Sequence, residues 1–413
     1  MSKRTAFVAA ALVAVALSVQ AATAAPKKPA KAAGAGMLVG INDEAATLYG
    51  NPPEAFAALK SLNVKVLRVN LYWGGTPWAV AKSKPSDATD PGDQAYSWAL
   101  YDRLARYAET YHIQLMFSIL FTPNWANGGK GKNVAPTNPQ ALQDFAQAAA
   151  TRYDGFYIPP AWQQQPTLEK PTEPLPAVTL WTAWNEPNNP VFLVPQYAKQ
   201  GGKWIVASAK SYAQICNAVY KGVHKVTVNA GAVTLLGPKV AEKEQVACGV
   251  TDPRGNDNPG ARSSIDPLTF LTAAKQFGMG PIDAYAHNPY PSAGTESPTY
   301  IPKGATARRV QLGNIGNLIS LVTKYYGSKP IWVTEYGYQT NPPNKTVYGT
   351  SWQNQAAWLT QSVSMARKNP RIKIFLWYLL KDGPPPGSWQ SGLETVTGQK
   401  KPAWAAFAKA AKG

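Results

Sequence analysis

The chain has 413 residues, of which 45% are hydrophobic, and its formal net charge at pH 7 is +18. This length and apolar content exclude a minimal domain and allow either one elaborated barrel or two domains. The basic charge also fits a nucleic-acid-binding protein, but the chain has no basic helix and no aromatic-basic recognition motif, so we expect no nucleic acid partner. Electrostatic association with an anionic polysaccharide or envelope surface, or simple solubility, explains the charge as well.

Residues 1–25 have the pattern of a signal peptide. Lys3 and Arg4 precede an apolar run and a small-residue cleavage site. The run is shorter than the ~20 residues that span a bilayer, so we expect cleavage and secretion to the extracellular space or cell envelope rather than anchoring. Residues 26–36, rich in Lys, Ala and Pro, are predicted to be a flexible linker, and residues 37–413 to be the folded domain.

Apolar, β-branched runs alternate with amphipathic segments along the folded domain. The predicted strands are residues 37–42, 64–73, 113–122, 178–185, 226–233, 282–286, 331–335 and 372–378. The predicted helices are residues 53–62, 96–111, 140–153, 204–224, 267–277, 309–326, 352–368 and 403–411. Eight such pairs predict an α/β fold, a (β/α)8 TIM barrel. A doubly wound open sheet is less favoured, because no Gly-rich phosphate turn follows the first strand.

Active sites of such barrels lie at the carboxyl ends of the strands and in the loops that follow. Four long loops are predicted there, at residues 74–95, 234–265, 288–307 and 381–402. The Pro-rich residues 158–176 precede the fourth strand, so they belong to the opposite rim and are expected to be structural. The four loops would form the walls of a cleft.

Two glutamates each close an apolar strand at that rim. Glu186 lies in Trp-Asn-Glu-Pro-Asn after the fourth strand, and Glu335 lies in Trp-Val-Thr-Glu-Tyr-Gly at the end of the seventh. Glycoside hydrolysis needs two carboxyl groups, one protonated and one ionised. A pair of glutamates at one barrel mouth therefore indicates cleavage of a glycosidic bond.

With these motifs on strands four and seven, the chain resembles clan A of the retaining glycoside hydrolases, most closely families 39 and 5. The resemblance covers essentially the whole folded domain and includes Leu67-Arg68-Val69 on strand two. It implies that Glu186 is the general acid/base and Glu335 the nucleophile of a double displacement. It also implies that Asn185 binds the sugar 2-hydroxyl.

Further side chains are assigned to substrate binding. Arg68 is a plausible counter-charge for the ionised glutamate, with a barrel-bracing salt bridge as the alternative. On strand six, His287 and Tyr290 resemble a His and Tyr pair of the family, in which the tyrosine hydroxyl orients the nucleophile. The spacing differs by one residue from the usual one, so either Tyr290 or Tyr285 could fill that role.

Aromatic side chains near the strand ends are candidates for stacking on pyranose rings. Trp377 is the leading candidate, and about half of the set is expected to touch sugar, the remainder being core. The set comprises Trp73, Trp78, Trp125, Trp352, Trp377 and Trp389.

Cys216 and Cys248 are the only cysteines, and an even number in an exported protein predicts one disulfide bond. Their spacing matches no metal motif, and the two carboxyl groups suffice for the chemistry, so neither metal nor organic cofactor is expected.

These observations predict a secreted, monomeric retaining β-glycoside hydrolase that acts on a polysaccharide or oligosaccharide, with endo action favoured. Two alternatives stay open. A carbohydrate-binding barrel without activity would share the fold, and a transglycosidase would share the covalent intermediate. The sugar and its linkage depend on loop shapes that the sequence does not give.

Overall fold

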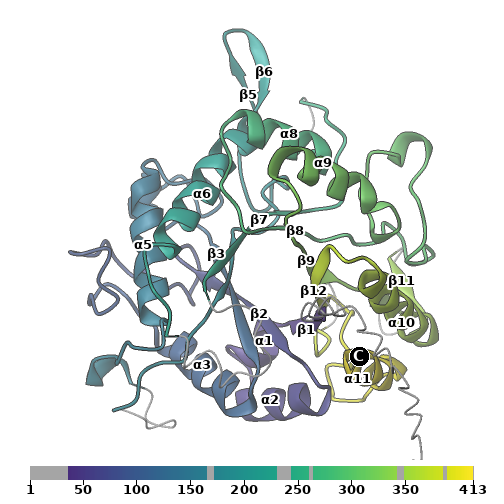
Figure 1. The fold of residues 1–413 in the computed structure, drawn as a ribbon, viewed down its shortest axis with the longest axis horizontal. Coiled ribbons are helices and arrows are strands. Elements are labelled where there is room, and N and C mark those ends of the chain that lie inside the picture. The colour runs from purple at the N-terminus through teal and green to yellow at the C-terminus, as the bar shows by residue number, and fades with distance from the viewer. Residues whose placement is uncertain are drawn as a thin grey trace, which may run out of the picture. The chain divides into compact units, whose positions relative to one another are not determined.

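The computed structural model describes residues 36–164, 172–229, 243–259, 264–341, 348–384 and 388–412. Within them, eight parallel strands close a barrel in the order β1-β12-β9-β8-β7-β4-β3-β2 (Figure 1). Strand β1 pairs with both β2 and β12, which completes the ring and rules out an open sheet. The predicted (β/α)8 TIM barrel is thus confirmed. The barrel strands are β1 (Leu38–Asn42), β2 (Val66–Tyr72), β3 (Gln114–Leu120), β4 (Leu180–Ala183), β7 (Gln245–Thr251), β8 (Ala284–His287), β9 (Ile331–Tyr336) and β12 (Ile372–Tyr378).

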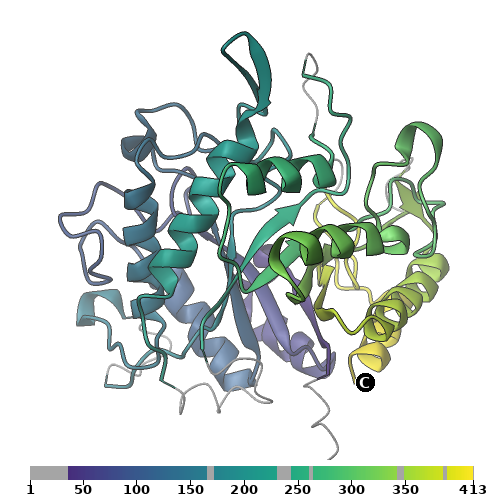
Figure 2. The same ribbon diagram turned by 45° about the horizontal axis from the view of Figure 1, so that its top comes forward.

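Helices surround the barrel (Figure 2). Their bounds agree with the sequence prediction to within a few residues, except that α6 and α9 begin later than expected. Residues 203–206 belong to a hairpin that projects from the barrel (Figure 1), and α9 is preceded by a 3-10 turn. The long helices are α2 (Pro52–Ser61), α3 (Ala99–Tyr111), α5 (Pro139–Arg152), α6 (Ala207–Val223), α8 (Pro267–Gln276), α9 (Gly316–Tyr326), α10 (Trp352–Lys368) and α11 (Pro402–Lys412). The remaining elements are α1 (Glu44–Thr47), α4 (Asn124–Asn127), the hairpin β5 (Tyr197–Gln200) with β6 (Lys203–Val206), and the pair β10 (Gln339–Thr340) and β11 (Gly349–Thr350).

The fifth strand was predicted in the wrong place. Residues 226–229 are irregular, residues 230–233 lie outside the described part of the chain, and the fifth barrel strand is β7. β7 contains Ala247, Cys248 and Gly249, residues with weak strand propensity that resemble a loop in sequence. The small residue is required at Gly249, because a Cβ atom there would lie 2.4 Å from the ring of Tyr285 on the next strand.

The barrel interior is filled with apolar side chains below a polar upper layer. One buried cluster draws members from all eight strands, as expected for a packed TIM-barrel centre. A second, larger cluster joins the outer faces of the strands to the helices. The barrel is therefore solid, and a ligand can reach it only at its ends.

The predicted disulfide bond is confirmed. Cys216 of α6 is bonded to Cys248 of β7, with an S–S distance of 2.08 Å. It fixes the fifth strand to the helix that precedes it.

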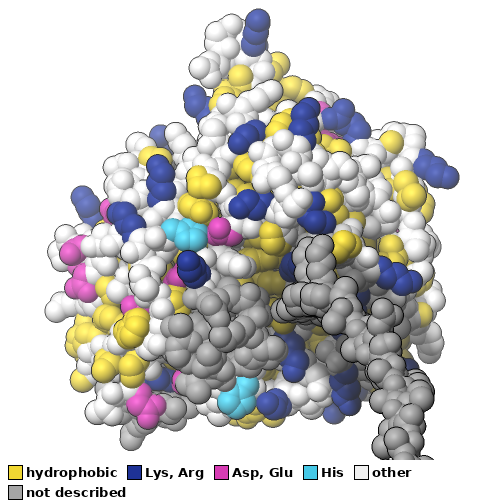
Figure 3. Space-filling model, in the orientation of Figure 1, with side chains coloured by type: hydrophobic (Ala, Val, Ile, Leu, Met, Phe, Trp, Pro, Cys, Tyr) yellow, Lys and Arg dark blue, Asp and Glu magenta, His cyan; other side chains and the backbone are white. Residues whose placement is uncertain are grey.

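Among the described helices none is long and apolar enough to cross a membrane. Lys and Arg side chains are scattered over the face shown in Figure 3 rather than gathered in one patch, and Asp and Glu are fewer there. This distribution differs from the single basic stripe that marks a nucleic-acid-binding face.

Candidate active site

The backbone is strained where four barrel strands end. Phe121, Trp184, Glu186, Val250 and Leu379 have positive φ angles between 38° and 77°. Non-glycine residues seldom adopt this region, and such residues cluster at functional sites. They follow or close β3, β4, β7 and β12, at the carboxyl ends where a barrel carries its chemistry.

Glu186 is fixed by its neighbours on β7. Its backbone N–H donates to the carbonyl of Val250 at 2.8 Å. Two residues on, the Asn188 side chain donates to the carbonyls of Asp252 and Ile265 and accepts from the N–H of Asp252. The turn after β4 is therefore built into the loop after β7, which sets the direction of the Glu186 carboxyl group.

The Glu186 carboxyl group is buried among donors and other acids. Asn288 Nδ2 donates to Oε1 at 3.0 Å, and Asn189 Nδ2 lies 3.4 Å from Oε2. The residue is 9% exposed. Burial, and then the negative charges of Asp252 and Glu335, raise the pKa of Glu186 well above its usual value, outweighing the Asn288 hydrogen bond, which lowers it. Glu186 therefore holds its proton at a higher pH than an exposed glutamate does.

Glu335, on β9, is held by an ion pair and a phenol. Arg68 Nη1 lies 2.6 Å from Oε1, and the Tyr290 hydroxyl donates to Oε2 at 3.0 Å. Burial and the charge of Glu335 raise the pKa of Tyr290, so this hydroxyl stays protonated and remains a donor. Tyr285, the other tyrosine considered, is fully buried on β8 beside Gly249. The geometry thus favours Tyr290 as the partner of Glu335.

Arg68 connects the two carboxyl-bearing strands. Besides Glu335, its guanidinium donates to Asn185 Oδ1 at 2.9 Å and to Ser118 Oγ at 2.7 Å. Asn185 is thereby oriented with its oxygen toward Arg68. Its amide nitrogen is left as the donor for a ligand.

Two of the predicted binding residues lie below the cleft surface. His287 is fully buried; its Nε2 donates to the Val310 carbonyl at 2.9 Å, so its Nδ1 accepts from Thr251 Oγ1 at 2.8 Å. Burial lowers the pKa of His287 to about 4, so the ring is neutral at neutral pH. Trp377 is also fully buried and donates from Nε1 to the Ser391 carbonyl at 2.8 Å.

Aromatic rings form one side of the site. The ring centroids of Tyr290 and Trp389 are 5.9 Å apart, and those of Tyr378 and Trp389 are 5.6 Å apart. Of the predicted stacking set, Trp389 is 42% exposed, Trp78, Trp125 and Trp352 are half-buried, and Trp73 is fully buried like Trp377. Trp125 lines a cavity of about 540 Å³ at the ends of β2 and β3, together with Lys82 and Lys132.

Sequence reasoning did not assign roles to several residues of the site. Asn288 bonds Glu186 and also accepts from Thr334 Oγ1 at 2.7 Å, so it joins β8 and β9 to the acid. Asp252 accepts from Asn189 at 2.9 Å and adds negative charge beside Glu186. Their signal was position alone: each directly follows a barrel strand.

Similarity to solved structures is strong in fold and weak in sequence. A family 39 glycoside hydrolase from the gut symbiont Bacteroides cellulosilyticus WH2 matches with a TM-score of 0.56 at 19% identity, over 90% of this chain and 63% of that protein. Xylanase 10B from Thermotoga maritima matches with a TM-score of 0.51 at 11% identity, over 91% of this chain and 95% of the xylanase. A fungal β-1,4-galactanase matches with a TM-score of 0.50 at 12% identity, over 90% and 99% of the two chains.

The chain spans less than two thirds of the family 39 protein, and identities this low establish a shared fold. The fold expected from the resemblance to clan A is thereby confirmed. No protein-family model matches the sequence, and no curated protein matches it.

Proposed function

We propose that the protein is a secreted retaining glycoside hydrolase that cleaves β-glycosidic bonds in a polysaccharide, with endo action. The observation that carries the proposal is the opposite treatment of two carboxyl groups at one barrel mouth. Glu186 is buried near other acids and keeps its proton, while Glu335 is paired with the Arg68 cation. A retaining mechanism needs that division of roles.

In the proposed reaction, Glu186 protonates the glycosidic oxygen as Glu335 attacks the anomeric carbon. The bond from that carbon to the leaving oxygen breaks, and an ester bond to Glu335 forms. We place the proton on Glu186 Oε2, because Oε1 accepts from Asn288. A water molecule then gives its proton to Glu186 and its oxygen to the anomeric carbon, which releases Glu335 with retained configuration.

The surrounding residues receive roles that follow from their contacts. Arg68 and Tyr290 hold the Glu335 carboxylate, and the Asn185 amide nitrogen donates to the sugar 2-hydroxyl. His287 and Trp377 act as positioning residues, because both are fully buried and neither presents a free polar atom of its ring to the cleft. Exposed Trp389 is the aromatic face that we assign to the sugar.

The test is hydrolysis of a panel of plant, fungal and bacterial β-glycans by the protein without residues 1–25. Glu186→Ala and Glu335→Ala run alongside, each with and without azide. We expect oligosaccharide ladders from the wild type alone, a β-glycosyl azide from Glu186→Ala and an α-glycosyl azide from Glu335→Ala. Binding without turnover on every glycan, or undiminished turnover by Glu335→Ala, would refute the proposal.

A further inference from the structure

A second carboxyl group at the mouth of the barrel is incompletely satisfied. Glu44, the first residue of α1, accepts hydrogen bonds on Oε1 from the Tyr72 hydroxyl at 2.6 Å and the Tyr49 hydroxyl at 3.2 Å. Its Oε2 is buried, and no donor among the described residues reaches it with bonding geometry. A buried carboxylate oxygen without a partner is costly, which makes it a place where a ligand donor is missing.

Strand pairing places Glu44 directly above the catalytic layer. Asn42, two residues before Glu44, is the register partner of Arg68 on β2 and of Tyr378 on β12. Arg68 is the residue that pairs with Glu335. Glu44 therefore projects from the strand that lies between the arginine of the site and Tyr378.

The face of β2 connects the two carboxyl groups. Arg68, Asn70 and Tyr72 alternate with fully buried Val69 and Leu71, so the three polar side chains share one face. The first of the three bonds Glu335 and the last bonds Glu44, with Asn70 Nδ2 3.4 Å from the Tyr72 hydroxyl between them.

This row of side chains leads away from Glu335, whereas Asp252 and Asn189 lie beside Glu186. In a retaining mechanism the nucleophile contacts the sugar that stays behind, and the acid contacts the leaving group. The Glu44 side of the cleft thus faces the glycone, the part of the substrate on the non-reducing side of the cleaved bond.

An aromatic pair borders the same carboxyl group. The ring centroids of Tyr49 and Trp78 are 4.8 Å apart, Tyr49 is 40% exposed, and Trp78 is half-buried. The hydrogen bond from Tyr49 to Glu44 is long and lies at the surface, so rotation of Tyr49 opens the carboxyl group to a ligand. Aromatic faces beside a hydrogen-bond acceptor suit a pyranose, which has apolar faces and a hydroxyl-bearing edge.

Resting on the proposed function, we propose that Glu44, Tyr49 and Trp78 form a specificity subsite for the second glycone sugar. A hydroxyl of that sugar donates to Glu44 Oε2 while the ring packs on the aromatic pair. The subsite selects chains with at least two sugars before the cleaved bond, and it requires a hydroxyl donor on the second sugar.

The experiment compares substrates with one and two glycone sugars. 4-Nitrophenyl β-glycosides of glucose, xylose, galactose and mannose are assayed beside the corresponding β-linked disaccharides, with wild type, Glu44→Gln and Tyr49→Ala. The wild type should show higher kcat/KM on the disaccharide of the preferred sugar. Glu44→Gln should lose about tenfold or more of that gain, the scale of one hydrogen bond to a charged group.

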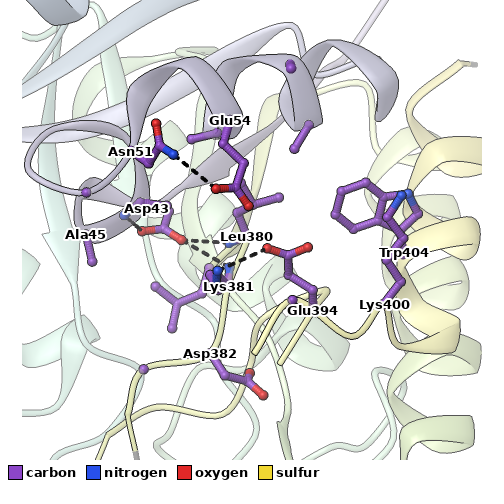
Figure 4. A pocket seen from close by; sticks show the side chains of 18 of the residues that line it. Asp43, Ala45, Asn51, Glu54, Leu380, Lys381, Asp382, Glu394, Lys400 and Trp404 are labelled. Atoms are coloured by element: carbon purple, nitrogen blue, oxygen red, sulfur yellow. Dashed lines mark hydrogen bonds and ion pairs between the residues drawn. The ribbon is translucent and has the colours of Figure 1, made fainter. Parts of the chain in front are cut away.

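Glu54→Gln is the matched control. Glu54 lies on α2, is exposed, and lines a cavity of about 600 Å³ formed by α1, α2 and the segments that follow β12, with Glu394 and Trp404 (Figure 4). Glu44 does not line that cavity, so Glu54→Gln should keep the wild-type gain. A Glu44→Gln variant that loses the same factor on both substrates, or on neither, overturns the subsite.

A binding measurement separates this inference from the proposed function. Tetrasaccharides of the same sugars are titrated by calorimetry into Glu335→Gln and into the double variant with Glu44→Gln. If the wild type hydrolyses nothing, the proposed function fails, yet a tenfold or greater loss of affinity in the double variant still supports the subsite. Equal affinities, or no binding of any tetrasaccharide, overturn it.

Discussion

Arg68 Nη1 and Glu335 Oε1 lie 2.6 Å apart although 267 residues separate them in sequence. The guanidinium is 1% exposed and its other nitrogens bond Ser118 and Asn185, so one cation positions three side chains from three other strands. This places the ionised carboxyl group and the amide that we assign to the sugar in one rigid network.

Replacing Arg68 with Met should destabilise the fold and abolish turnover. The variant leaves a largely buried carboxylate without its cation, a change that typically costs about 3–5 kcal/mol. Urea unfolding measures the free energy, with Arg308→Met as control, because Arg308 pairs with Asp257 from a side chain that is 66% exposed. The control should change by about 1 kcal/mol or less. Equal losses in the two variants would contradict a structural role for the buried pair.

Tyr290→Phe should reduce kcat with little effect on stability. It removes one hydrogen bond to the nucleophile, worth about 1.5–3 kcal/mol when the acceptor is charged, or roughly 10- to 100-fold in rate. Initial-rate kinetics on the preferred glycan measure the change, and Tyr300→Phe, at an exposed position, serves as the control. A Tyr290→Phe enzyme with wild-type kcat would remove Tyr290 from the site.

Asp252→Asn should move the alkaline limb of the pH profile of kcat/KM to lower pH. The negative charge of Asp252 raises the pKa of Glu186, so its removal lowers that pKa. The general acid then loses its proton earlier as pH rises. The profile of the exposed-site variant Asp90→Asn should coincide with that of wild type. A shift to higher pH would show that Glu186 is not the acid.

Removal of the Cys216–Cys248 disulfide should destabilise the protein without changing the chemistry. The bond closes a loop with a sequence separation of 32, for which chain entropy predicts about 3–4 kcal/mol. The double variant Cys216→Ala/Cys248→Ala should show this loss in chemical unfolding while kcat at low temperature is retained. Unchanged stability would mean that packing of α6 on β7 already fixes the strand.

The sequence predicted the elements that have strong periodicity and the motifs that end them. Glu186 and Glu335 follow apolar strands, and the closed barrel brings them to one rim. β7 escaped prediction because Ala247, Cys248 and Gly249 are small for reasons of packing against β8, which a single sequence does not reveal.

Side-chain direction was harder to predict than position. Trp377 and Tyr378 are adjacent aromatic residues at the end of β12, and one of them had to face inward. The pairing of β12 with β9 shifts register between Phe375 and Trp377, so simple alternation along the strand does not give the orientation. The structure buries Trp377, and the aromatic cluster at the site contains Tyr378 and Trp389 instead.

The ring order of the strands has an evolutionary consequence. Between the strands that carry the two glutamates lie only β7 and β8, and Asn288 and Asp252 after these strands hold or surround the acid. The spacing of the carboxyl groups is therefore inherited from the barrel itself rather than from any surface loop. Loops such as residues 74–95 can lengthen, shorten or exchange residues across generations, so that sugar preference can drift while the bond-breaking pair stays in place.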